Sequence, residues 1–279
     1  MKIGVPAEVK NNEHRVGLTP ESAKTLNDLG HQLFVQSNAG HAIGFTNELY
    51  ESAGAKICDS AAEVYSSSDL IIKVKEPVEA EFQFLRADLS LFTYLHLAGD
   101  PVQAKKLLET GVTGIAYETV TADDGSLPLL APMSAIAGQL SIVVGSYHLL
   151  KPNNGRGTLL SELDPRIVTV IGAGVAGKEA ILKAKANHAK VRVVDLNPSK
   201  LKQLKNEFGE EGIEFIISSP DAIKKAVSDS DLVIGSVYVV GKEAPKVVTN
   251  EMLGDMEEGS VLVDISIDQG GCFESSKPT

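Results

Sequence analysis

Residues 167–180 read Ile-Val-Thr-Val-Ile-Gly-Ala-Gly-Val-Ala-Gly-Lys-Glu-Ala, an apolar run that meets three glycines and continues into a helical pattern. The run 167–171 is typical of a strand buried on both faces of a parallel sheet. Gly172 would permit the tight turn out of the strand, Gly174 would let the backbone approach a pyrophosphate, and Gly177 would let the next helix pack closely on the sheet. The N–H groups and positive dipole end of that helix would face the phosphates. The stretch therefore predicts a Rossmann-type dinucleotide-binding unit.

A second predicted strand, 191–195, ends in Asp195, which lies 23 residues after Gly172. A carboxylate at this point can accept hydrogen bonds from the ribose hydroxyls of NAD and repels the 2′-phosphate of NADP. Arg192 precedes the acid and is poorly placed to bind such a phosphate. A glycine-rich turn can also occur in an ordinary α/β domain that binds no dinucleotide. Because strand, glycines, helix, second strand and acid occur here in the order that the motif requires, we expect a dinucleotide site with NAD as its cofactor.

Two of these glycines also fit the start of a P-loop, the phosphate-binding loop of NTPases, since Gly172, Gly177 and Lys178 match its spacing G-x-x-x-x-G-K. That motif continues with Ser or Thr, which binds magnesium. This chain has Glu179 instead, and its carboxylate would repel phosphates. The sequence therefore argues against an NTPase.

Composition is that of an ordinary globular protein, with 279 residues that are 43% hydrophobic and 23% charged, long enough for two domains. A net charge of -11 gives no reason to expect binding to nucleic acid or to a membrane surface. Residues 1–6 look like a strand rather than a signal peptide, and no apolar run is long enough to span a bilayer. Cys58 and Cys272 have no metal-ligand spacing, and neither do the histidines, so we expect no metal site. Free buried thiols indicate a cytoplasmic protein.

The first half alternates strands and helices, which predicts a parallel α/β sheet. The predicted strands lie at 2–6, 32–36, 70–74, 89–94 and 112–117. The predicted helices lie within 19–30, 46–53 and 100–110. Lys75 and His96 each follow a predicted strand. Since the carboxyl ends of parallel strands form the ligand crevice, both side chains are expected near a ligand.

The second half begins with a linker-like segment, 125–132, followed by one long predicted helix, 133–150, of the kind that joins two domains. We place a substrate domain at 1–128 and a Rossmann NAD-binding domain, including the linking helix, at 129–279. Strands are predicted at 167–171, 191–195, 213–217, 232–235 and 261–264. Helices are expected between them, including 198–208 and 249–256. Five strands with intervening helices fit a doubly wound sheet. The expected fold class is thus α/β with two parallel-sheet domains.

Ten short motifs follow one another along the chain: MKIGVP at 1–6, NNEHRV at 11–16, TP at 19–20, KVKEP at 73–77, FTYLHL at 92–97, AYET at 116–119, LPLLAPMS at 127–134, GAGVAG at 172–177, APK at 244–246 and VDISIDQGGCFE at 263–274. On these motifs the chain resembles the alanine dehydrogenase family, collinearly and over essentially its whole length. The nucleotide-binding subunit of proton-pumping transhydrogenase is a cousin that lacks the IDQGGCF pattern at 267–273.

This resemblance implies roles for individual residues. Arg15 would grip the substrate carboxylate, and Lys75 would bind the carboxylate or the carbonyl oxygen. His96 would act as acid and base, and Asp268 would lie by the nicotinamide and assist the proton transfers. Arg, Lys and His suit these tasks, because they provide a two-pronged anion grip, a point charge and a group that titrates near neutrality.

On the cofactor side, the resemblance places Ser134 and Ser218 toward the phosphates, Met133 along the site and Asp195 on the adenosine ribose. The interpretation of the cofactor site also includes Gly172, Gly174, Val175, Gly177, Lys200, Val237 and Ile265. The cleft between the two domains would be the reaction chamber.

Each of these residues also has a plainer interpretation. Arg15 could be a solvated loop charge, Lys75 a strand-end ion pair and His96 a core histidine. Asp268 could simply form the turn before the two glycines that follow it, and Ser134 and Ser218 could be helix caps.

The resemblance implies reversible, NAD-dependent oxidation of L-alanine to pyruvate and ammonia by a homo-oligomer, a hexamer in the family. The sequence does not separate alanine from serine or glycine, because a methyl group adds little binding energy. Family chains continue beyond residue 279 with a segment that completes the first domain. A second function is therefore left open: a non-catalytic NAD-binding module, either a transhydrogenase-like subunit or a truncated remnant.

Overall fold

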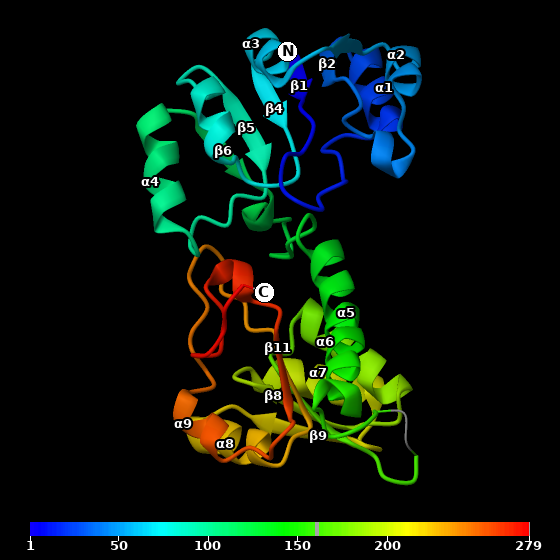
Figure 1. Ribbon diagram of the computed structural model, residues 1–279, viewed down its shortest axis with the longest axis vertical. Coiled ribbons are helices and arrows are strands. Elements are labelled where there is room, and N and C mark those ends of the chain that lie inside the picture. The colour runs from blue at the N-terminus through cyan, green and yellow to red at the C-terminus, as the bar shows by residue number, and fades with distance from the viewer. Residues whose placement is uncertain (160–161, 279) are drawn as a thin grey trace. The chain divides into compact units, whose positions relative to one another are not determined.

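The computed structural model describes residues 1–159 and 162–278, and the chain divides into two compact units, Met1–Val120 and Thr121–Thr279 (Figure 1). We refer to them as unit 1 and unit 2. Each unit is built on its own parallel sheet, which confirms the predicted fold class of two parallel α/β sheets.

In the described residues of unit 1, six parallel strands have the order β3-β2-β1-β4-β5-β6. The strands are β1 (Lys2–Val5), β2 (Gln32–Gln36), β3 (Lys56–Cys58), β4 (Leu70–Ile72), β5 (Ser90–Thr93) and β6 (Thr113–Ala116). The helices are α1 (Pro20–Asp28), α2 (Asn47–Ser52), α3 (Ala61–Ser67) and α4 (Pro101–Thr110), with 3-10 turns η1 (His41–Ile43), η2 (Glu79–Phe84) and η3 (Tyr117–Thr119). The direction of winding reverses between β1 and β4, and ligand crevices form at such switch points.

Local sequence accounts for most of these elements. The Thr19 hydroxyl accepts a hydrogen bond from the Ser22 N–H at 3.2 Å and Pro20 opens α1, as the Thr-Pro-Glu motif predicts. One face of the sheet packs Ile3, Val5 and Val35 against α1 and α2. The other face packs Ile71 and Leu91 against α3, α4 and η2.

Two elements of unit 1, β3 and α3, have no counterpart among the predicted ones. The strand is only three residues long and lies at the sheet edge, too short for an alternation to be recognised. The predicted strand 70–74 also ends early, at Ile72, although the Lys73 N–H still donates to the Phe92 carbonyl and the Tyr94 N–H to the Val74 carbonyl, each at 3.2 Å. The N–H of Val74 donates to the Glu8 carboxylate at 2.6 Å.

In the described part of unit 2, five parallel strands have the order β11-β10-β7-β8-β9. They are β7 (Ile167–Ile171), β8 (Lys190–Asp195), β9 (Ile213–Ile217), β10 (Leu232–Gly235) and β11 (Val261–Asp264). The helices are α5 (Ala131–Leu149), α6 (Val175–Ala186), α7 (Pro198–Phe208), α8 (Pro220–Ser228) and α9 (Asn250–Gly254), with 3-10 turns η4 (Lys151–Asn153) and η5 (Ile267–Gln269). The switch point lies between β7 and β10, so the sheet is doubly wound as predicted.

The long predicted helix is α5, which packs against α6. A Cβ at Gly138 would overlap the Ala176 carbonyl oxygen and lie 2.9 Å from the Glu179 Cβ, so glycine allows the two helices to approach closely. Helices α5, α6 and α7 cover one face of the sheet, and α8 and α9 cover the other. Among the described residues, the structure has no helix with the length and hydropathy that a bilayer crossing requires.

Candidate active site

The turn from β7 to α6 is built by glycines with different roles. Gly172 has φ +107°, and a Cβ there would lie 2.6 Å from the Ser236 carbonyl oxygen. A Cβ at Gly177 would overlap the Gly172 carbonyl oxygen and lie 2.9 Å from its carbonyl carbon. The fold itself therefore requires glycine at both positions, and Gly177 provides the close packing of helix on strand that the motif predicts.

Gly174 differs from these two glycines. It is the N-cap of α6 with φ -77°, a value open to any residue, and no heavy atom of the described residues lies within 4 Å of a Cβ built on it. The fold thus gives no reason for glycine at this position. Since Gly174 lines a pocket, its missing side chain leaves room for a ligand to approach the backbone.

That pocket has a volume of about 630 Å³ and lies at the carboxyl ends of β7, β8, β9 and β10. Eight of the predicted cofactor residues line it: Ser134, Gly172, Gly174, Val175, Asp195, Lys200, Ser218 and Val237. Met133, Gly177 and Ile265 are not among the described lining residues. Gly177 lies in the helix–strand contact, and Ile265 packs against the core.

Ser134 and Ser218 are not the caps of the helices near them. The N-cap of α8 is Ser219, whose hydroxyl accepts from the Ala222 N–H at 3.1 Å, and the N-cap of α5 is Leu130. Both serines line the pocket. The plainer interpretation of these two residues as helix caps is therefore wrong.

Asp195 ends β8 with its carboxylate fixed by two backbone groups. One oxygen accepts from the Ala173 N–H at 2.6 Å and the other from the Asn197 N–H at 2.7 Å. Each carboxylate oxygen has a second lone pair, which a ribose hydroxyl can use. Arg192 is engaged elsewhere, with Nη2 at 3.1 Å from the Asp229 carboxylate, and this bond lowers the pKa of Asp229.

Ser236 is a pocket residue that the sequence patterns did not single out. It follows β10, and its hydroxyl donates to the carbonyl oxygens of Ile171 and Gly172, each at 3.0 Å. It thereby fixes the glycine turn from the neighbouring strand. Its place directly after a predicted strand, 232–235, was the available signal. These features fit a dinucleotide. The space at Gly174 and the N-terminus of α6 suit its pyrophosphate, and Asp195 at the end of β8 suits its ribose.

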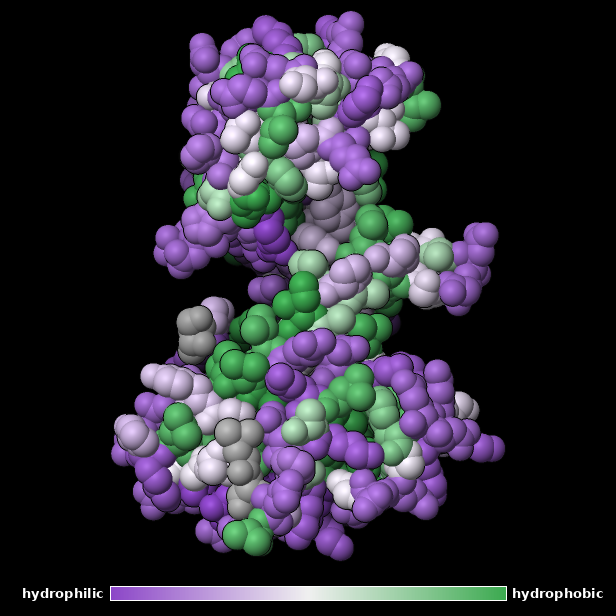
Figure 2. Space-filling model, turned by 90° about the vertical axis from the view of Figure 1, so that its right-hand side faces the viewer, coloured by the Kyte–Doolittle hydropathy of each residue, from purple (hydrophilic) through white to green (hydrophobic). Residues whose placement is uncertain are grey.

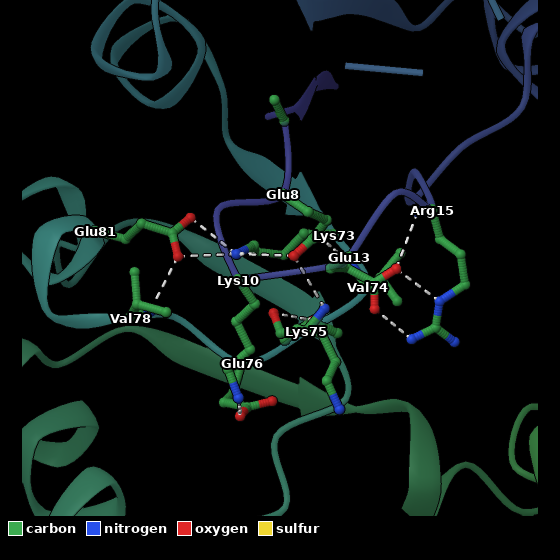
Figure 3. Close-up of polar contacts among 12 residues, drawn as sticks. Glu8, Lys10, Glu13, Arg15, Lys73, Val74, Lys75, Glu76, Val78 and Glu81 are labelled. Atoms are coloured by element: carbon green, nitrogen blue, oxygen red, sulfur yellow. Dashed lines mark hydrogen bonds and ion pairs between the residues drawn. The ribbon is translucent and has the colours of Figure 1, made fainter. Parts of the chain in front are cut away.

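In unit 1, the three predicted substrate residues follow three adjacent strands. Arg15 lies in the loop after β1, Lys75 follows β4 and His96 follows β5. The Arg15 guanidinium donates to the Glu13 carboxylate from Nε at 2.8 Å and from Nη2 at 2.5 Å (Figure 3). This pair raises the pKa of Arg15 and lowers that of Glu13.

Two further residues connect these three. The Tyr94 ring stacks on the His96 ring with centroids 5.8 Å apart. Burial raises the pKa of Tyr94, and the nearby positive charge of Arg15 opposes that shift. The charge of Lys75 likewise helps to lower the pKa of Glu13. Arg15, Lys75 and His96 therefore share one neighbourhood at the carboxyl end of this sheet.

A buried ion cluster lies beneath Lys75, and the sequence patterns did not reveal it. The Lys73 ammonium is 2.8 Å and 2.9 Å from the two Glu81 oxygens and 3.5 Å from a Glu8 oxygen. Tyr65 donates to Glu81 at 3.0 Å. Figure 3 shows Lys73 pointing between the two carboxylates while Lys75 extends away from them.

Glu8 connects this cluster to the site. Its carboxylate accepts from the Val74 N–H at 2.6 Å and from the Lys75 N–H at 3.4 Å. Burial raises the pKa of Glu8, and Lys73 partly offsets this effect. The cluster thus fixes the backbone that carries Lys75.

Asp268 lies in unit 2, exposed on η5, ahead of Gly270 and Gly271 with φ +89° and +75°. The loop is fixed by the Asp264 carboxylate, which accepts from the Cys272 N–H at 2.7 Å. It is also fixed by Lys246, which donates to the Gly271 carbonyl at 2.8 Å. The described residues contain no group of three His, Cys, Asp or Glu side chains arranged to hold a metal ion.

Comparison with known proteins gives a consistent picture along the whole chain. The profile of the alanine dehydrogenase/PNT N-terminal domain matches residues 4–137, and that of the alanine dehydrogenase/PNT C-terminal domain matches residues 141–279. The chain is 47% identical over 282 aligned positions to an alanine dehydrogenase of Mycolicibacterium smegmatis, covering 100% of this chain and 76% of that protein. An alanine dehydrogenase of Methanococcus maripaludis is 44% identical, with 99% and 74% covered.

Solved structures extend the comparison. An L-alanine dehydrogenase superposes with a TM-score of 0.86 at 43% identity, covering 100% of this chain and 78% of that one. A transhydrogenase from Sinorhizobium meliloti superposes with a TM-score of 0.78 at 27% identity, with 99% and 82% covered.

Proposed function

The chain belongs to the alanine dehydrogenase/PNT family, and we propose that within it the protein is an NAD-dependent L-alanine dehydrogenase. The reaction is L-alanine, NAD⁺ and water giving pyruvate, ammonium, NADH and a proton, and it is reversible. One observation carries the proposal. Arg15, Lys75 and His96 lie after adjacent strands around Tyr94 and Glu13, in a chain 47% identical to a curated alanine dehydrogenase.

The cofactor would be held in unit 2 by the turn at Gly172 and Gly174, with Asp195 on its ribose. When bound, NAD supplies the acceptor for the hydride that leaves the alanine Cα. Asp195 favours NAD over NADP, because its charge repels a 2′-phosphate.

The residues of unit 1 would act on the amino acid. Arg15 pairs with the substrate carboxylate through parallel N–H groups, and Lys75 lies by the oxygen that becomes the ketone. His96 takes a proton from the water that adds to the iminium carbon, and returns one to the departing amine. Asp268, on the unit 2 side, assists these transfers. Met133 and Ile265 remain proposals for the cofactor side.

A transhydrogenase-like NAD-binding module is the second candidate, and the likeness to a transhydrogenase structure at 27% identity favours it. The 43% identity to a solved L-alanine dehydrogenase argues more strongly for the enzyme. The two functions differ in one observable, because only the enzyme oxidises an amino acid.

The test is formation of NADH, followed by absorbance, with L-alanine, L-serine and glycine as substrates. We expect turnover with L-alanine. His96→Ala should abolish turnover and leave the dissociation constant for NAD, measured by calorimetry, within about twofold. His41→Ala is the matched control, an exposed histidine of the same unit. NAD binding without turnover in the unaltered protein would favour the module, and loss of NAD affinity in His96→Ala would assign His96 to structure.

We also propose a homo-oligomer, with the family's hexamer as the expected form. Helix α5 exposes an apolar stripe in which Ile136, Leu140, Val143 and Tyr147 are each at least half exposed. Figure 2 shows hydrophobic surface on the side of unit 2 that carries α5. Such a stripe is typical of a subunit contact. Light scattering gives the mass, and Leu140→Glu should lower it; an unchanged mass would remove α5 from the contact.

The proposed location is the cytoplasm. Cys58 and Cys272 are both free and buried, as expected where thiols stay reduced. Fractionation of the native cells would test this.

A further inference from the structure

His96 adopts a backbone conformation that histidine rarely holds. Its φ is +49°, in the left-handed region where a side chain is strained. The residue follows β5 (Ser90–Thr93) after Tyr94 and Leu95, and its ring stacks on that of Tyr94. A residue held in a strained conformation needs surrounding groups that fix it, and such positions cluster at functional sites.

Glu118 is the group that fixes it. This residue lies in η3, directly after β6, the strand that pairs with β5, and it is only 4% exposed. One carboxylate oxygen accepts the His96 N–H at 2.6 Å. The Leu95 N–H lies 3.2 Å from each of the two oxygens. The buried Glu118 carboxylate thus accepts hydrogen bonds from two successive backbone N–H groups, that of Leu95 and that of His96 itself.

The carbonyl side of the same turn is also held. The Gly99 N–H donates to the His96 carbonyl at 3.0 Å, and the Gln103 amide donates to the Leu95 carbonyl at 3.2 Å. Among the described hydrogen bonds to the backbone of Leu95 and His96, the one between the His96 N–H and Glu118 is the shortest. Glu118 is also the only carboxylate among these described partners. Charge-assisted bonds of this kind are the strong ones.

We propose that Glu118 is a positioning residue for His96. It holds the left-handed turn that points the imidazole toward the substrate, and it acts through backbone N–H groups rather than on substrate. The inference rests on the proposed function, since it assumes that His96 transfers protons. It also explains why the AYET motif carries a buried acid in a turn with no other assigned role.

Two substitutions at this position should have graded effects. Glu118→Ala removes both acceptors. Glu118→Gln keeps one oxygen for the His96 N–H but places an amide donor 3.2 Å from the Leu95 N–H, so it should preserve part of the geometry. Because a misplacement of about 1 Å can cost about 100-fold in rate, we expect kcat to fall about 100-fold in Glu118→Ala and about 10-fold in Glu118→Gln.

The kinetic test compares kcat with KM for L-alanine in these two variants and in Glu109→Gln, an exposed carboxylate on α4. KM should stay within about threefold, because Arg15 and Lys75 are unchanged. Because Glu118 lies in unit 1 and the cofactor pocket in unit 2, circular dichroism and urea unfolding of each variant, rather than NAD binding, correct for any misfolded fraction. An unchanged kcat per folded molecule, or a raised KM with kcat retained, would overturn the proposal.

A crystal structure of Glu118→Ala, which removes both acceptors, provides a readout that does not need turnover. We expect His96 to leave the left-handed region or to lose its stacking on Tyr94. A variant in which both are retained would overturn the positioning role. If the unaltered protein oxidises no amino acid, the proposed function fails on its own, and the crystal structure still decides whether Glu118 holds His96.

Discussion

The first five strands of each unit lie in the same order, to which unit 1 adds a sixth strand, but the two units use this order differently. In unit 2, the first strand β7 passes into α6 through a three-residue turn, 172–174, which turns the backbone and the bare Cα of Gly174 toward the pocket. In unit 1, the first strand β1 passes into α1 through the longer loop 6–19, which carries Glu8, Glu13 and Arg15. Loop length at the switch point therefore decides whether the backbone or side chains form the site.

The way each site is held differs as well. Unit 2 fixes its turn by close packing, in which Gly177 fits against Gly172 and Ser236 bonds to the turn carbonyls. Unit 1 fixes its loops by carboxylates, with Glu8 under Lys75 and Glu118 under His96. A closely packed turn loses stability when even one methyl group is added. The stability that buried carboxylates provide instead depends on their protonation and therefore on pH.

The largest expected effect comes from the glycines. Gly177→Ala places a methyl group onto the Gly172 carbonyl, backbone that cannot move aside. We expect unit 2 to lose about 3 kcal/mol of stability in urea unfolding, at the upper end of overpacking effects. Gly174→Ala is the matched control, because its Cβ meets no described atom within 4 Å.

Gly174→Ala should keep stability within about 0.5 kcal/mol, as is usual for substitutions away from packed features. It should nevertheless weaken NAD binding at least about 10-fold, since the methyl group enters the space expected for the pyrophosphate. Equal stabilities for the two variants would contradict the packing argument. Normal NAD affinity in Gly174→Ala would contradict the proposal that the turn at Gly172 and Gly174 holds the cofactor.

The contrast between the units also explains what the sequence could predict. In unit 2 the strands 213–217, 232–235 and 261–264 coincide with β9, β10 and β11, because apolar runs bounded by turn residues are local signals. The glycine turn and the acid at the end of β8 are local too, at fixed spacing. Gly172, Gly174 and Asp195 line the pocket for this reason, whereas Ser134 and Ser218, which also line it, were implied by the resemblance.

Unit 1 offered fewer such signals. Nothing near Lys73 and Lys75 distinguishes the lysine that is buried between two carboxylates from the one that extends away. Glu118 accepts N–H groups 22 and 23 residues earlier in the chain, an arrangement that exists only once β5 and β6 pair. The resemblance identified Arg15, Lys75 and His96, but not the acids that hold them.

An intermediate effect is expected at Asp195. Asp195→Asn removes the charge that repels a 2′-phosphate and turns an amide donor toward one of the N–H groups that the carboxylate now binds. The preference for NAD over NADP, measured as a ratio of kcat/KM, should fall about 10-fold, which corresponds to about 1.4 kcal/mol. Arg192→Ala should leave this ratio unchanged, because the Arg192 guanidinium is bonded to Asp229. A change in Arg192→Ala as large as that in Asp195→Asn would place both residues at the ribose.

The smallest effect, and the one that depends on pH, is expected at Glu8. Burial raises its pKa above the ordinary value of 4.5, so the folded protein binds a proton more readily than the unfolded chain. The stabilisation linked to that proton is complete below pH 4.5 and is lost as pH rises through the folded pKa. Glu8→Gln imitates the protonated acid and keeps an acceptor for the Val74 N–H, while Glu81 still holds Lys73.

Urea unfolding at pH 5 and pH 8 measures this linkage. Glu8→Gln should gain stability relative to the unaltered protein between the two pH values, by less than Gly177→Ala loses, and Glu109→Gln should show no such trend. A difference that does not vary with pH would mean that Glu8 keeps one protonation state throughout. A loss of stability in Glu8→Gln confined to pH 8 would mean that attraction between the Glu8 carboxylate and Lys73 outweighs the cost of burying that carboxylate. Unit 1 would then be held by a charged pair directly beneath Lys75, the proposed substrate lysine.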